Sequence, residues 1–118
     1  MPTRFIIATL VWVGSLLAFS TNAQKRYTAM ELQQMMDAGQ APIQEQGGPP
    51  SKIQSLPFSS CVPTVDGLVN NAMAQYPVKI LVAAESFYIA KVWASDDVTT
   101  YICNQSEGTL TVLTHKYR

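Results

Sequence analysis

Residues 78–115, VKILVAAESFYIAKVWASDDVTTYICNQSEGTLTVLTH, decide the fold of this 118-residue chain. Strand-forming residues alternate here with a period of two and are interrupted by three short polar turns. We therefore expect four strands, at Val78–Ala84, Phe87–Ala94, Val98–Asn104 and Thr109–His115. Because such short turns join antiparallel neighbours, whereas a parallel crossover needs a dozen or more residues, the strands should form an antiparallel meander.

A helix is expected directly before the meander. Its apolar residues recur at steps of three and four, as in an amphipathic helix: Val65, Leu68, Val69, Ala72, Met73 and Tyr76. Thr64 is placed to cap the helix, Asp66 falls in its first turn, and Pro77 ends it. Residues 61–118 are thus predicted to be an α+β domain in which one helix packs on a four-stranded antiparallel meander.

Two cysteines bear on how this domain is held together. Cys61 precedes the predicted helix and Cys103 lies near the end of the third strand. An even number of cysteines in a small exported chain is most simply explained by a disulfide. We predict a Cys61–Cys103 bond that fixes the start of the helix to the sheet.

Export is predicted from residues 1–23, which have the pattern of a secretory signal peptide. Arg4 precedes an apolar run from Phe5 to Phe19, and small residues end the segment at Ala23. The protein is then periplasmic or extracellular and has no stable membrane anchor. A retained anchor is the alternative, although the apolar run of about 15 residues is shorter than the roughly 17 to 25 that span a bilayer.

Between leader and domain we expect a helical segment and a linker. Thr28 and Glu31 have the spacing of a capping box, and Gly39 is placed to end a helix, so residues 24–39 should contain a helix from Ala29 to Ala38. Proline and glycine recur from residue 40 to residue 60, a composition typical of a flexible linker.

The predicted strands have apolar residues on both sides. Phe87, Ile89 and Trp93 oppose Tyr88, Ala90 and Val92; Tyr101 and Cys103 oppose Val98 and Ile102; Val78, Ile80 and Val82 oppose Leu81 and Ala83. Because one helix covers one face, the other should be covered by the N-terminal helix, by a second copy in a homo-oligomer, or by an unknown protein partner. The candidate interaction residues are Trp93, Tyr88, Tyr101, Leu32, Met35 and Met36.

Composition argues against several classes of function. Eight basic and eight acidic residues give a net charge of zero, which does not suit nucleic-acid binding. One histidine, His115, and two cysteines expected to be bonded make neither a zinc cluster nor an evident catalytic site, so we expect no metal, no cofactor and no enzyme activity.

The sequence thus favours a small exported, non-enzymatic binding or accessory protein that acts by protein–protein contact. Two alternatives stay open. An inhibitor or immunity-type protein would block an enzyme in the same compartment through a loop such as Ser95–Asp97, and a small enzyme would have to use His115.

Overall fold

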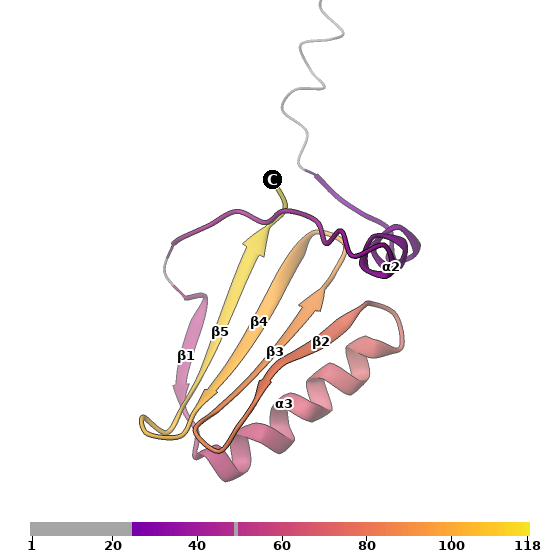
Figure 1. The fold of residues 1–118 in the computed structure, drawn as a ribbon. Helices are drawn as coiled ribbons and strands as arrows, with labels where there is room; N and C mark the ends of the chain where they lie inside the picture. Colours follow the sequence, from indigo (N-terminus) through magenta and orange to yellow (C-terminus); the bar gives the residue numbers. More distant parts are fainter. Residues whose placement is uncertain (1–24, 49) are drawn as a thin grey trace, which may run out of the picture.

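The computed structural model describes residues 25–48 and 50–118, and the predicted signal peptide lies outside these residues. The described elements are α2 (Ala29–Asp37), β1 (Lys52–Ser55), α3 (Phe58–Met73), β2 (Val78–Ala83), β3 (Phe87–Trp93), β4 (Asp97–Asn104) and β5 (Thr109–Lys116). The sheet is antiparallel throughout, with the order β1-β5-β4-β3-β2. The predicted α+β fold and the meander, formed by β2 to β5, are confirmed (Figure 1).

One strand, β1, was not predicted, and it lies within the segment expected to be a linker. Ile53 of β1 is directly opposite Thr111 of β5. Ahead of β1, Gln44 bridges to Tyr117, and the Glu45 amide donates to the Lys116 carbonyl at 2.8 Å. These backbone bonds are made with residues about 60 or more positions away, so part of the proline- and glycine-rich segment is ordered by the sheet rather than by its own composition.

The main helix begins earlier than predicted. It starts at Phe58, with Pro57 as its N-cap residue, so Thr64 is not the cap and Asp66 is not in the first turn. The Thr64 hydroxyl instead donates to the Ser60 carbonyl at 2.7 Å within the helix. The prediction failed at Pro63, which lies inside α3 even though proline cannot supply a helical amide donor.

The core lies between α3 and one face of the sheet. Its buried residues are Cys61, Val65 and Val69 of α3 and Ala90, Val92, Cys103 and Leu110 of the strands. The predicted bond is present, with Cys61 and Cys103 joined at an S–S distance of 2.03 Å and both fully buried. Leu68 and Met73, expected in the same apolar stripe, are instead 42% and 56% exposed, so the stripe of α3 that meets the sheet is narrower than predicted.

A β-bulge in β2 changes which residues share a face. Ile80 is opposite Ala90, but the register shifts at Leu81, so that Val82 is opposite Ile89 and Ala83 is opposite Tyr88. The prediction that Val82 lies on the same side as Ile80 is therefore wrong, because a bulge inserts one residue and inverts the alternation beyond it.

The N-terminal helix α2 begins at Ala29 as predicted and ends at Asp37, one residue before the predicted end. Thr28 and Glu31 form the reciprocal capping box, with bonds of 2.8 and 3.1 Å. Gly39 has a φ of +72°, and its amide and that of Gln40 bond back to the last turn, which closes the helix. Leu32 is fully buried in a second cluster with Trp93, Val98 and Tyr117. Figure 1 shows α2 at the end of the sheet near the C-terminus, with α3 against the sheet itself.

Candidate interaction surface

The face of the sheet opposite α3, termed the open face, carries a continuous row of mostly aliphatic side chains. The strand register places five residues directly opposite one another, one from each strand: Ile53, Thr111, Ile102, Ile89 and Val82. Ile53 is 60% exposed and Val82 is 37% exposed, and the three central residues are half-buried. Among the described elements, α2 covers only the end of this face, at Trp93 and Val98. We call these five residues the aliphatic row.

Two lysines, termed the lysine pair, lie next to each other on one side of the aliphatic row. Lys79 of β2 is directly opposite Lys91 of β3, two residues along the strand from Ile89. The Lys91 amine lies 5.3 Å from the centre of the Trp93 ring, and burial lowers the pKa of this amine. Like charges at directly opposite positions of a sheet repel each other. Among the described residues Arg26 and Asp96 form an ion pair, whereas neither Lys79 nor Lys91 is ion-paired, although Asp37 of α2 lines the same groove as Lys79.

The strand positions of the open face carry no negative charge among the described residues. The strand residues on this side are aliphatic, aromatic or polar, or are lysine or histidine, and none is aspartate or glutamate. The surface is therefore apolar along the row and positive at one side of it, a combination suited to binding a complementary protein surface.

His115 lies on this face too, but its setting differs from the prediction. The predicted strand ended at His115, whereas β5 continues to Lys116, so that His115 lies inside the strand, opposite Val98, and is half-buried. Within residues 25–48 and 50–118 its Nδ1 is buried without a hydrogen-bond partner. No orienting carboxylate or adjacent nucleophile is paired with the ring there, as general-base chemistry would require.

None of the six predicted interaction residues belongs to the aliphatic row or the lysine pair, although Trp93 lies at the covered end of the open face. Leu32 is fully buried and Trp93 is 5% exposed, because both belong to the buried cluster that α2 forms with the sheet. Met36 borders that cluster, and Met35 is half-buried on the same helix. Tyr88 and Tyr101 pack against the core on the α3 side of the sheet. Local sequence patterns do not reveal the aliphatic row or the lysine pair, because which side chains are neighbours depends on strand register, including that of β1, and on the bulge in β2.

Tyr88 forms a tie between the sheet and α3. Its hydroxyl donates a hydrogen bond to the Asp66 carboxylate. Burial, together with that hydrogen bond and the negative charge of Asp66, raises the pKa of Tyr88 to about 12. The phenol therefore stays protonated at neutral pH, and its role here is to hold α3 against β3.

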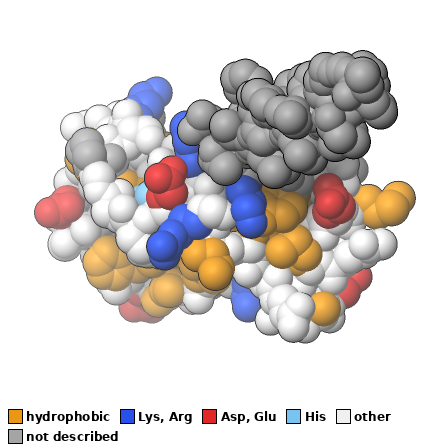
Figure 2. Space-filling view, turned by 90° about the horizontal axis from the view of Figure 1, so that it is seen from above, with side chains coloured by type: hydrophobic (Ala, Val, Ile, Leu, Met, Phe, Trp, Pro, Cys, Tyr) orange, Lys and Arg blue, Asp and Glu red, His pale blue; other side chains and the backbone are white. Residues whose placement is uncertain are grey.

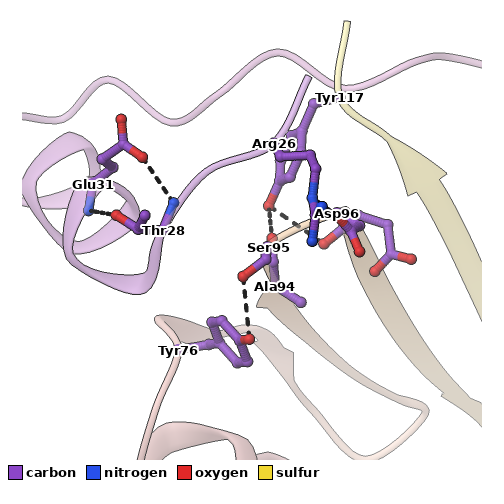
Figure 3. A network of polar contacts seen from close by, with 9 residues as sticks. Arg26, Thr28, Glu31, Tyr76, Ala94, Ser95, Asp96 and Tyr117 are labelled. Atoms are coloured by element: carbon purple, nitrogen blue, oxygen red, sulfur yellow. Dashed lines mark hydrogen bonds and ion pairs between the residues drawn. The ribbon is translucent and has the colours of Figure 1, made fainter. Parts of the chain in front are cut away.

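The turn Ser95–Asp97, the predicted inhibitory loop, is held by contacts within the chain. Figure 3 shows the Tyr117 hydroxyl donating to the Ala94 carbonyl and Tyr76 bonded to Ser95. The Tyr27 amide donates to the Ser95 carbonyl at 3.0 Å. Figure 2, which views this end of the sheet, shows positive and negative side chains close together over it. The turn residues are half-buried, and the side chain of Asp96 is 50% exposed.

The described surface also has two grooves. A groove of about 330 Å³ between α2, α3 and the start of β2 is lined by residues that include Met36, Asp37, Met73 and Lys79. A wider one, of about 650 Å³, lies at the start of α3 beside Glu85 and Gln105. Neither groove gathers an acid–base pair with a nucleophile, and the described residues bring together no group of three or more metal-ligating side chains.

Comparison with known proteins found no match, whether to family models, to curated proteins or to solved structures. Within residues 25–48 and 50–118, no helix is both long enough and apolar enough to cross a membrane. The Cys61–Cys103 bond is typical of proteins that fold in an oxidising compartment.

Proposed function

We propose that this protein is a small exported, non-enzymatic binding or accessory protein that holds a protein partner on its open face. The observation that carries the proposal is the aliphatic row, which runs across all five strands and is not covered by α3 or by α2. A contiguous apolar surface of this kind is uncommon on a protein that has no partner. Export is supported by the pattern of residues 1–23 and by the disulfide.

The alternatives have less support. The turn Ser95–Asp97 is bonded to Tyr27, Tyr76 and Tyr117, so an inhibitor acting through it would first have to break those contacts. An enzyme using His115 would need a group to orient the ring, and Nδ1 has no such partner in the described part of the chain. Binding through the open face requires neither the breaking of these contacts nor a group that orients His115.

Site-specific photo-crosslinking in the protein's own host tests this proposal. A photoreactive phenylalanine analogue is placed at Ile102, in the centre of the aliphatic row. A matched control places the same analogue at Leu68, an exposed apolar residue on α3. We expect a discrete adduct of higher mass from position 102 and none from position 68. A further variant carries the analogue at Ser95, in the turn. An adduct from position 68 or from position 95, with none from position 102, would contradict the proposal.

The adduct must also depend on the apolar character of the row. Replacing Thr111, the neighbour of Ile102 in the row, by aspartate should abolish the adduct at position 102 while the protein stays folded. Folding is monitored by circular dichroism. An adduct that persists at the same yield would show that the row does not provide the contact.

A further inference from the structure

We infer that the segment bound on the open face is an amphipathic helix of a different protein, with its apolar stripe on the aliphatic row and an acidic flank facing the lysine pair. This inference rests on the proposed function and identifies the chemistry of the partner. Its strongest support is the pairing of Lys79 with Lys91, directly opposite each other and without a carboxylate partner in the described chain.

The electrostatic interaction between Lys79 and Lys91 is repulsive in the free protein, and an acidic partner would offset this repulsion. Two ammonium groups at directly opposite positions repel, and the Lys91 amine is also partly removed from water. A carboxylate between them would neutralise the repulsion. Lys91 is two residues from Ile89, so the pair lies about 7 Å from the row along the strand. Side chains that border the apolar stripe of a helix are displaced from it by a similar distance.

A second copy of the chain does not satisfy these conditions. The strand positions of the open face include no aspartate or glutamate, and Asp37 belongs to α2, which already packs on the end of the sheet. Two such sheet faces brought together would therefore offer no carboxylate from their strands to either lysine pair. Charge complementarity therefore favours a different, acidic protein. Nucleic acid would supply negative charge but nothing to cover the aliphatic row.

An anionic membrane fits the shape of the surface poorly. Membrane-binding surfaces insert projecting apolar side chains some distance below the headgroups. Ile89 and Ile102 are half-buried among their neighbours in the sheet, and only Ile53 at the edge is more than half exposed. A flat surface of this kind suits a packed protein layer.

A helix suits this face better than a strand does. Backbone groups of the central strands are already bonded to neighbouring strands, so the face offers side chains only. A strand would add to a free sheet edge, at β1 or β2, and would leave the row uncovered. On the opposite face the chain covers the sheet with a 16-residue helix, α3, and the partner would form the matching third layer.

Selection from a displayed library of helical peptides, unbiased in charge, tests the inference. The target is the protein expressed from its full-length sequence and purified as the host processes it. We expect the selected peptides to combine apolar residues at helical spacing with an excess of aspartate and glutamate. Against the double variant K79E/K91E, the charge bias should reverse toward lysine and arginine. The best acidic peptide should bind this variant at least ten-fold more weakly than the wild type.

Controls separate the charge of the face from the total charge of the protein. Lys52→Glu changes one lysine that lies on the other side of the sheet, opposite Val112, and should leave the acidic bias unchanged. If the charge-reversed variant fails to fold, K79Q/K91Q gives the same test, because neutral glutamines should abolish the bias without reversing it. Vesicles of phosphatidylglycerol, in parallel, provide an anionic surface without a helix.

The outcomes distinguish this inference from the proposed function. Peptides that require the row, so that I102D abolishes their binding, but that show no acidic excess would overturn the acidic partner and leave the binding function standing. Peptides that bind I102D as well as wild type would contradict both. Strong binding to the vesicles that is lost in K79E/K91E, with no peptide selected, would overturn the protein helix in favour of a lipid surface.

Discussion

Removing the Cys61–Cys103 bond should cost a large share of the stability of this domain. The two cysteines are 42 residues apart. For a loop of this length the chain-entropy relation gives about 4 kcal/mol of stabilisation. Small domains have total stabilities of roughly 5 to 15 kcal/mol. The variant for this test is Cys61→Ala with Cys103→Ala, since serine would leave buried hydroxyls at two fully buried positions.

Urea denaturation followed by circular dichroism measures the effect. With an m-value of about 1 kcal/mol per molar, the midpoint should fall by about 4 M. Wild-type protein that is unfolded, reduced and refolded in reductant keeps both sulfurs and provides the control for the small cavities left by alanine. It should show a similar fall. A midpoint within about 1 M of the oxidised wild type, in both samples, would refute this reasoning.

Three further outcomes are expected. Leu32→Ala should weaken the docking of α2 by about 3 kcal/mol, a value typical of truncating a buried leucine. Amide hydrogen exchange should become faster in α2 but not in α3. Unchanged exchange in α2 would contradict the packing of Leu32 in the cluster with Trp93. Thr28→Ala should destabilise α2 by about 1 kcal/mol in the same assay, and no change would show that the capping box adds nothing. Tyr88 has a folded-state pKa of about 12, above its ordinary 10.0, so its contribution to stability is present below pH 10 and lost as the pH rises to 12. The difference in stability between wild type and Tyr88→Phe should shrink over that pH range, and a constant difference would exclude the bond to Asp66.

Elements whose signals are local in the sequence could be predicted. The alternation from Val78 onward gave the meander, with strand ends within one or two residues of those observed. Thr28, Glu31 and Gly39 determine α2 because each acts on backbone groups within four residues of itself. The disulfide followed from there being two cysteines.

Elements stabilised by distant residues could not be predicted from local patterns. β1 contains one aliphatic residue, Ile53, and forms because β5 supplies its hydrogen bonds. The start of α3 was placed too late because Pro63 resembles a helix boundary, and tertiary packing of Cys61 against the sheet overrides it.

The candidate surface depends on register, which explains why it was missed. Alternation placed Ile89 and Ile102 on apolar sides of their strands, but only strand pairing shows that they are neighbours. The bulge at Leu81 then brings Val82 into the same row. Trp93, a candidate anchor by residue type, is buried in the same cluster as Leu32 of α2.

Isoleucine methyl groups report directly on whether the open face is accessible. A soluble nitroxide broadens the signals of methyl groups that it can approach, and the spectrum is recorded on dilute protein labelled at isoleucine. Ile43, exposed away from the row, serves as the internal reference. We predict that the methyl signals of Ile53, Ile89 and Ile102 broaden together with that of Ile43. Sharp signals from Ile89 and Ile102 would mean that the chain or a second copy already covers this face, and would contradict its role as a binding surface.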